Sequence, residues 1–302
     1  MPSARELWPG DNAPRWWHGA RQAYDRAVSA SAPFGSGRLL AGAGAVGRLL
    51  HRLPGAVPSP GLVAAVVGDD RSIDEWRGIA REISALRYRN RATLALVSRH
   101  GAGALDPLLE RDATDALQEV RGPVVVLWWH VGPAYGLSAA IARAGLPVLS
   151  LRRARAHQPE PGIEVAAVGD SQGRALAFAR AVVRVRGGGI AIVPADGQHG
   201  TLLPPVSCLG RAVCLARGPF ALARLTGAPL VPVVAHWSAA GRIGVVVGAR
   251  TRVPRGGSED ADLERERTAA GEAARWFERH VRQSPGQLWV RTMRWVLAAP
   301  RA

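Results

Sequence analysis

His130 is the side chain in this sequence best placed for acid–base chemistry. It directly follows an apolar run, Pro123 to Trp129, that has the composition of a buried strand. Ligands of open α/β sheets bind beyond the carboxyl ends of the strands, so this histidine stands where a substrate is expected. A histidine beside an apolar run is also often a structural side chain. Position alone therefore leaves both roles of His130 open.

A second polar cluster follows another apolar run. Residues 189–195 read as a strand, and Asp196, Gln198 and His199 come directly after it. The carboxyl ends of neighbouring parallel strands share one edge of a sheet. We therefore expect the clusters after residues 129 and 195 to belong to one site.

The rest of the chain has to supply the sheet that positions these residues. Besides the runs at 122–129 and 189–194, short apolar segments separated by helical stretches occur at 146–151, 163–168, 229–236 and 243–247. This alternation predicts an α/β fold in which helices cover a central mixed or parallel sheet.

Helices are expected before and after these strands in the sequence. Ser72 and Glu75 form a capping box followed by apolar residues at helical spacing, which predicts a long helix beginning near Ile73. A charged surface helix is expected from about Glu259 to Arg282. We predict a helical, membrane-proximal extension over residues 1–70 and one α/β domain over residues 71–302.

The stretch Leu39 to Leu53 is amphipathic, and such a helix can lie in a lipid interface. Packing against the main domain is the favoured alternative, because glycines at 42, 44 and 47 weaken an isolated helix. The same glycines have the G-x-G-x-x-G spacing of a dinucleotide site. That site is rejected because no sufficiently long buried strand precedes them.

The charge of the chain favours anionic partners. Lys and Arg number 39 against 24 Asp and Glu, which gives a formal net charge of +15. A genome rich in G and C also produces arginine-rich proteins. Because no nucleic-acid-binding signature occurs, a membrane or an acidic carrier protein is favoured over nucleic acid.

Targeting and metal signals are missing from the sequence. The first fifteen residues have no apolar core of a signal peptide, and no uncharged apolar run reaches about eighteen residues. We therefore expect a peripheral protein on the cytoplasmic face of the membrane. Cys208 and Cys214 lack further ligands at zinc spacing, so neither a metal site nor a disulfide framework is predicted.

Several motifs together resemble the lysophospholipid acyltransferase-like enzymes, in particular the group of lipid A lauroyl/myristoyl and phosphatidylinositol mannoside acyltransferases. The resemblance covers roughly Ser72 to Trp295. It rests on the strand-His-x-Gly element at His130, the strand-Asp-Gly-Gln element at Asp196, the stretch Pro205-Val-Ser-Cys-Leu-Gly-Arg211, the stretch Thr226-Gly-Ala-Pro-Leu-Val-Pro232, and the closing Trp- and Arg-containing stretch from Pro285 to Trp295.

This resemblance implies transfer of an acyl group from acyl-CoA or acyl carrier protein to a hydroxyl of a lipid or glycolipid, with no other cofactor. His130 would take the proton of the acceptor hydroxyl. The family has a carboxylate five residues after its histidine, whereas this chain has Tyr135 there, which supplies no charge. Asp196 is the expected replacement, with Tyr135 shaping the acceptor pocket. Asp170 is a poorer candidate, and an ordinary turn role for Asp196 stays open.

Arg153, which follows the run at 146–151, and Arg211, which lies in the matched Gly-Arg element, are candidate substrate-binding residues because arginine forks grip phosphate and carboxylate well. Gln198 of the Asp-Gly-Gln element is the third candidate. The departure at Tyr135 leaves one alternative open, a catalytically altered or inactive relative that binds lipid or acyl carrier. A basic membrane module without an active site is disfavoured by the polar strand ends. A serine hydrolase is disfavoured because no Gly-x-Ser-x-Gly elbow occurs.

Overall fold

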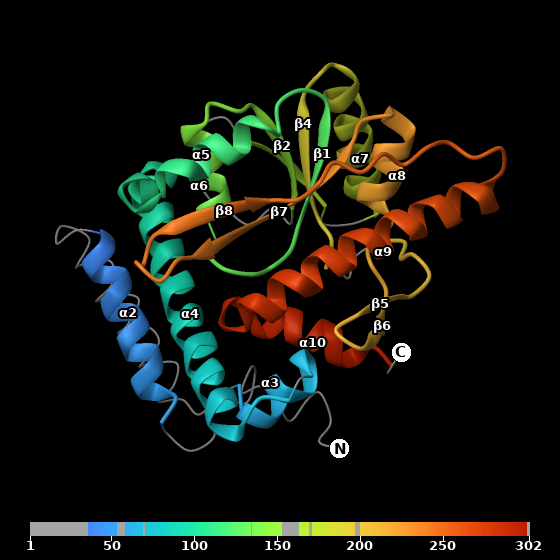
Figure 1. Cartoon of the computed structure of the whole chain (residues 1–302). Helices are drawn as coiled ribbons and strands as arrows, with labels where there is room; N and C mark the ends of the chain where they lie inside the picture. The colour runs from blue at the N-terminus through green and yellow to red at the C-terminus, as the bar shows by residue number, and fades with distance from the viewer. Residues whose placement is uncertain are drawn as a thin grey trace.

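A six-stranded sheet, with strand order β3-β2-β4-β1-β7-β8, forms the centre of the protein (Figure 1). The computed structural model describes residues 36–52, 58–68, 70–133, 135–152, 163–168, 171–196 and 200–300. The strands are β1 (Val124–Trp128), β2 (Val148–Arg152), β3 (Ile163–Ala167), β4 (Ile190–Pro194), β7 (Leu230–Trp237) and β8 (Ile243–Val247). Only β8 runs antiparallel to its neighbour. The predicted α/β fold is confirmed, and each predicted strand is present.

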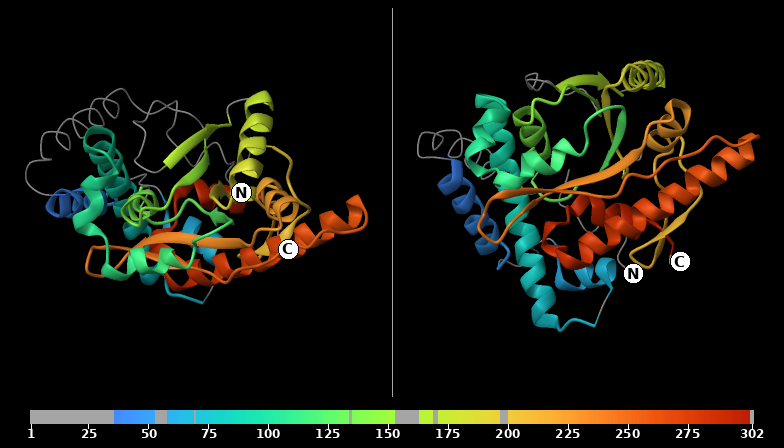
Figure 2. Two further views of the ribbon diagram at one scale, coloured as in Figure 1. Left: turned by 90° about the horizontal axis from the view of Figure 1, so that it is seen from above. Right: turned by 45° about the horizontal axis from the view of Figure 1, so that its top comes forward.

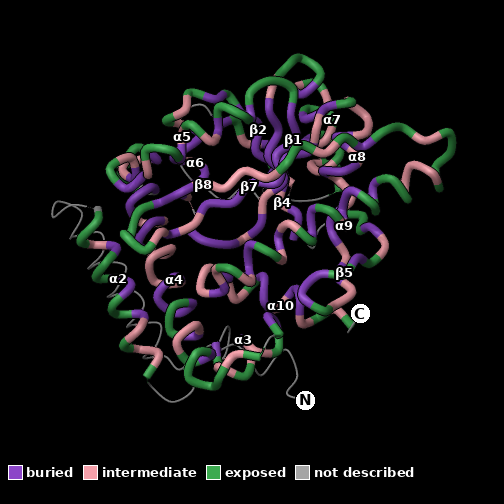
Figure 3. Tube along the Cα trace, viewed as in Figure 1, coloured by how far each residue is buried: buried purple, intermediate pink, exposed green. Residues whose placement is uncertain are grey.

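Helices cover both faces of this sheet (Figure 2). Val125 and Leu127 of β1 belong to one core cluster, whereas Val124 and Val126 belong to the other. The first cluster includes residues of α3 (Pro60–Val67), α7 (Ser171–Arg186), α8 (Gly218–Thr226), α9 (Glu259–Gln283) and α10 (Val290–Ala298), and the second includes residues of α2 (Ser36–Leu50), α5 (Arg111–Gln118) and α6 (Gly136–Arg143). Burial on both faces explains why the central strands are nearly continuous apolar runs (Figure 3).

The long helix α4 (Ile73–His100) begins at the predicted capping box. Ser72 Oγ accepts a hydrogen bond from the backbone N–H of Glu75, and the Glu75 carboxylate accepts one from the backbone N–H of Ser72 at 2.7 Å. Two backbone donors at the helix start are thereby satisfied. The predicted charged helix is also confirmed as α9.

Helix α2 packs along α4, which confirms the packing alternative for its sequence. A Cβ atom on Gly47 would lie 2.7 Å from the carbonyl oxygen of Ser84, and the Ser84 hydroxyl donates to the carbonyl of Gly47 at 2.9 Å. Gly44 and Gly47 therefore allow α2 to approach α4 closely, and all three glycines of the G-x-G-x-x-G spacing lie inside a helix. Leu53 lies outside the described residues. Among the helices that the structure describes, none is long and apolar enough to cross a bilayer.

One hairpin was not predicted from the sequence. Strands β5 (Val206–Cys208) and β6 (Arg211–Val213) pair antiparallel across Leu209 and Gly210, both of which have positive φ. Two consecutive positive φ angles are typical of the tightest hairpin turns. The hairpin packs on α9.

Buried His280 on α9 makes the fold sensitive to acid. Burial, and next the nearby His236, lower the pKa of His280 from 6.5 to about 4. Between these values the unfolded chain binds the proton more readily than the folded one, so stability falls as pH falls. We expect a loss of about 2 kcal/mol from this residue between about pH 7.5 and about pH 5.

Urea unfolding at each pH measures this effect. His280→Phe preserves the stacking on Trp276 and should flatten the dependence of the unfolding free energy on pH. An unchanged slope in that variant would assign the acid sensitivity to other groups.

Candidate active site

His130 and Asp196 meet at the carboxyl edge of the sheet. Trp128 of β1 pairs with Pro194 of β4, so the two parallel strands end at the same level. His130 and Asp196 each lie two residues beyond their strand. His130 Nδ1 lies 2.8 Å from Asp196 Oδ1, and the backbone N–H of His130 donates to Asp196 Oδ2 at 3.2 Å. The structure thus brings His130 and Asp196 together, whereas Gln198 and His199 lie outside the described residues.

Asp196 is almost completely removed from solvent, with 1% of its side chain exposed. Burial alone would raise the pKa of this carboxyl group, but the charge of and hydrogen bonds from His130, with a smaller contribution from Arg291, hold the pKa below its usual value. The carboxylate is therefore ionised at neutral pH. A buried anion at this distance fixes the imidazole with its proton on Nδ1.

Thr292 on α10 joins the pair from the far end of the chain. Its hydroxyl lies 2.7 Å from the carbonyl oxygen of His130 and 3.1 Å from Asp196 Oδ2. The hydroxyl has one proton and donates to one of these acceptors at a time. Thr292 thus holds both the backbone and the carboxylate that position the imidazole.

The imidazole of His130 lies between two tryptophans. Its ring centroid is 4.6 Å from that of Trp128 and 5.2 Å from that of Trp289. Trp289 Nε1–H donates to the carbonyl of Gly132 at 2.9 Å, which fixes the indole. With Nδ1 on Asp196, Nε2 of His130 is the ring nitrogen available to a substrate.

Gly132 explains why the His-x-Gly element requires its glycine. This residue has φ 61° and a Cβ atom there would lie 1.9 Å from the carbonyl oxygen of Ala235. Its N–H donates to the carbonyl of Gln287 at 2.8 Å. Only glycine fits so close to the backbone of β7, and this approach sets the path of the chain after His130.

His130 lines a cavity of about 550 Å³, a size typical of small-molecule sites. The cavity lies between the ends of the central strands and helices α7 and α8. Most of its described lining is apolar: Trp128, Leu151, Val168, Ala175, Phe178, Val193, Pro194, Ala216, Pro219, Ala221 and Leu225. Such walls favour a hydrocarbon group.

Arginines supply the charge of this cavity. Arg217 and Arg224 line it, and both are held from behind by the buried carboxylate of Glu266, at 2.6 and 2.7 Å. Arg224 also pairs with Asp262 at 2.6 Å. Two guanidinium groups are therefore fixed in place at the wall, where they can receive an anion.

Arg174 and Arg291 add two further guanidinium groups to the same cavity. Neither forms an ion pair with another residue in the part of the chain that the structure describes. The lining includes no Asp or Glu among the described residues. The site therefore combines apolar walls with cationic groups.

The other residues predicted from the sequence have different positions. Tyr135 stands at the start of α6 and packs against the second core cluster. Arg211 on β6 donates to the carbonyl of Ala299 at 3.1 Å and is not among the described residues that line the cavity. Arg153, Gln198 and the poorer candidate Asp170 lie outside the described residues.

Sequence reasoning missed Arg217, Arg224, Arg291 and Thr292 as site residues. Arg291 and Thr292 lie inside the closing stretch on which the resemblance rests, but no local signal selects them from it. Arg217 directly precedes α8, at the Gly-Pro start of a helix. That position was the sequence signal that could have indicated an anion site at Arg217, because helix N-termini attract anions.

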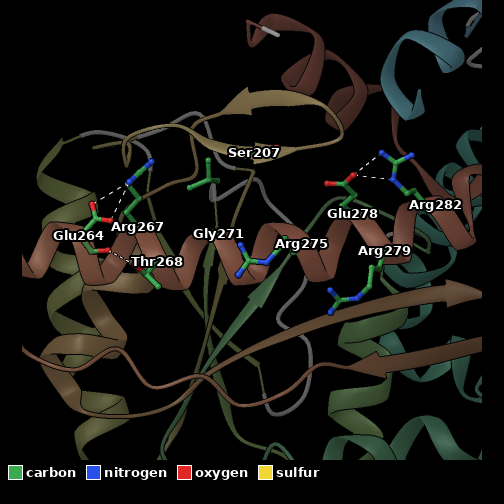
Figure 4. A pocket seen from close by; sticks show the side chains of 10 residues that line it. Ser207, Glu264, Arg267, Thr268, Gly271, Arg275, Glu278, Arg279 and Arg282 are labelled. Atoms are coloured by element: carbon green, nitrogen blue, oxygen red, sulfur yellow. Dashed lines mark hydrogen bonds and ion pairs between the residues drawn. The ribbon is translucent and has the colours of Figure 1, made fainter. Parts of the chain in front are cut away.

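A second cavity, of about 680 Å³, runs along α9 beside β5 (Figure 4). Arg267, Arg275, Arg279 and Arg282 line it together with Glu264 and Glu278. Arg282 is bound to Glu278 at 2.7 Å and also donates to the carbonyls of Val67 and Gly68. Neither His130 nor Asp196 lines this groove, so it lies apart from the acid–base pair.

Cys208 is buried and free. Burial, together with Glu278, raises the pKa of Cys208 to about 12, so its thiol is not a nucleophile at neutral pH. No group of three or more His, Cys, Asp or Glu residues among the described ones is arranged to hold a metal ion.

Comparisons with known proteins place this chain far from characterised relatives. No protein-family model matches the sequence, and no curated protein matches it. Among solved structures, the fold has a distant likeness to the 1-acyl-sn-glycerophosphate (LPA) acyltransferase PlsC from Thermotoga maritima, at 14% identity and a TM-score of 0.34, over 80% of this chain and 95% of that one. This likeness concerns the overall fold.

Proposed function

We propose that this protein is an O-acyltransferase, which moves a fatty acyl group from an acyl thioester to a hydroxyl of a lipid or glycolipid. The observation that carries the proposal is the His130–Asp196 pair at the wall of a largely apolar cavity with several arginines. This reaction needs a general base, an apolar surface that binds the acyl chain, and cationic groups that bind the anionic parts of the substrates.

The reaction follows from the geometry of the pair. Nδ1–H of His130 donates to Asp196, so Nε2 accepts the proton of the acceptor hydroxyl. The oxygen attacks the thioester carbonyl, a C–O bond forms and the C–S bond breaks. The imidazolium then returns its proton to the leaving sulfur. Buried Asp196 stabilises the imidazolium between these steps.

The lining suits both substrates. Apolar residues such as Phe178 and Leu225 offer a surface for the acyl chain. Arg217 and Arg224 are fixed by Glu266 and suit phosphate groups, which acyl-CoA and the prosthetic arm of acyl carrier protein both have. The net charge of +15 agrees with action as a peripheral protein on an anionic cytoplasmic membrane face.

Tyr135 bears on the alternative of a binding protein without catalysis. The resemblance places a carboxylate at that position, and a chain without any carboxylate beside its histidine would support the alternative. Asp196 provides one at 2.8 Å. This contact favours catalysis over binding alone.

The test is incubation of the purified protein with acyl-CoA or acyl carrier protein whose acyl group is labelled, together with a bacterial lipid extract. We expect label in an ester-linked lipid and an equal amount of released thiol. Free fatty acid as the sole labelled product would mean hydrolysis. An intact thioester with lipid bound to the protein would support the binding alternative instead.

A further inference from the structure

Helix α7 has an apolar outer face as well as an apolar inner one. Ala177, Ala181 and Val185 are buried against the sheet. On the other side, Leu176 is 62% exposed and Val183 is 73% exposed. Residues seven apart lie on the same face of a helix, so these two side chains form one solvent-facing strip, with Ala179 between them. Exposed residues of α7 are visible at the top of Figure 3.

Positive charge flanks this strip. Of the four arginines of α7, Arg174 lines the cavity of His130, which leaves Arg180, Arg184 and Arg186 for the outer side of the helix, and the helix has no acidic residue. Glu164 on β3 pairs with Arg180 and Arg184 and leaves an excess of cations on this face. Exposed leucine and valine between arginines are typical of surfaces that lie in the headgroup region of an anionic bilayer.

The helix that has this strip also lines the cavity of His130. Arg174, Ala175 and Phe178 of α7 line that cavity, so the strip and the cavity are on different sides of one helix. Leu202, also exposed, follows the lining residue Thr201. A bilayer against α7 would therefore stand beside the cavity.

We propose that the outer face of α7 is the surface that binds an anionic membrane, with Leu176 and Val183 inserted among the lipids. The inference deepens the proposed function, since it assigns the direction from which a lipid acceptor reaches His130. The occupant is a lipid surface because the face joins isolated apolar side chains to arginines, without the broad, closely packed apolar area of a protein interface.

Helix α2 provides a matched comparison. Its outer face exposes Leu49, at 62%, and Val46, at 38%, and Arg48 of the same helix pairs with Glu82 of α4. The three views place α2 at the left edge of the molecule and α7 towards the top, well apart from it (Figures 1 and 2). No residue of α2 lines the cavity of His130.

The experiment compares two double variants of the full chain. Leu176→Gln/Val183→Gln removes the apolar strip of α7, and Val46→Gln/Leu49→Gln makes the same change on α2. Each protein is sedimented with vesicles of equal parts phosphatidylglycerol and phosphatidylcholine, at low and high salt, after a thermal melt has shown it folded. We expect the α7 variant to lose about tenfold or more in vesicle partitioning, and the α2 variant to bind like the wild type.

The two salt concentrations separate the electrostatic contribution to vesicle binding from the apolar one. Wild type should retain part of its binding at high salt because the apolar contribution is not screened, whereas the α7 variant should lose nearly all of it. The proposal would be overturned if both variants lost vesicle binding equally or if only the α2 variant lost it. It would also be overturned if both variants bound vesicles like the wild type. The α7 variant could also bind vesicles normally and yet lose acyl transfer from acyl carrier protein. That result would assign the face to a protein donor and would overturn the membrane proposal.

Failure of the catalytic proposal would look different. Sedimentation contains no acyl donor, so an inactive protein can still bind vesicles through α7. If transfer activity is absent but the α7 variant alone loses binding, the acyltransferase proposal fails and the membrane face stands.

Discussion

Asp196→Asn is expected to lower kcat for acyl transfer by about 10⁴-fold and to leave the protein folded. The substitution keeps the shape of the side chain but exchanges one oxygen for an amino group. Its effect depends on which way the amide turns, and the neighbours of Asp196 decide that.

The backbone N–H of His130 is a fixed donor that points at Oδ2 of Asp196. An amino group in that place would set two donors against each other, so the amide oxygen takes the Oδ2 position. The amino group then faces Nδ1 of His130 and donates to it. The ring proton moves to Nε2, and a protonated Nε2 cannot accept the proton of the substrate hydroxyl.

Release of free thiol measures kcat, and a thermal melt shows that the variant folds. Thr292→Val is the control, because it removes a hydroxyl from the same contact but keeps the carboxylate and hence the tautomer. We expect that control to lose about tenfold at most, in line with one neutral hydrogen bond. An Asp196→Asn enzyme with a rate near that of the wild type would show that this carboxylate is not the partner of His130.

Glu266→Ala is expected to destabilise the fold by about 3–5 kcal/mol. Glu266 is fully buried and bridges Arg217 and Arg224, which are themselves mostly buried. Its removal leaves two guanidinium groups at the cavity wall without their common anion. Arg224 keeps its pair with Asp262, so the cost comes mainly from Arg217, whose buried charge loses its described ion-pair partner and is poorly solvated.

Glu264→Ala is the matched control for this experiment. Glu264 stands one half-turn earlier on α9 and is exposed, and its pair with Arg267 has an N–O distance of 3.2 Å. Exposed pairs of this kind contribute about 0–1 kcal/mol, so urea unfolding should show little change. Equal midpoints for the two variants would mean that the Glu266 bridge adds nothing to the fold. A raised KM in a folded Glu266 variant would connect the bridge to substrate binding as well.

The sequence predicted those parts of the fold that local patterns specify. Val124 to Trp128 is buried on both faces and is therefore apolar throughout, which made it readable as a strand. Parallel order then placed His130 and Asp196 at one edge, without any knowledge of the side-chain contact. The Ser72 capping box marked the start of α4 within one residue because its signal is local.

Contacts between distant segments could not be predicted in this way. Thr292 reaches His130 across 162 residues, and nothing near Thr292 in the sequence indicates that contact. Among 39 basic residues, the family resemblance favoured Arg211, whereas the cavity is lined by Arg217 and Arg224. Their selection depends on the buried Glu266 of a helix that comes later in the chain, so it is a property of packing.

The place of Thr292 also has a consequence for biosynthesis. When a ribosome has just added residues beyond Asp196, both members of the pair have been made, but β7 and α10 have not. The nascent chain then lacks both the hydroxyl of Thr292 and the indole of Trp289 that flanks the imidazole. A contact between segments so far apart in the sequence forms late in folding, because closing the long loop between them costs conformational entropy. The imidazole of a growing chain therefore gains its full set of neighbours only when α10 has docked.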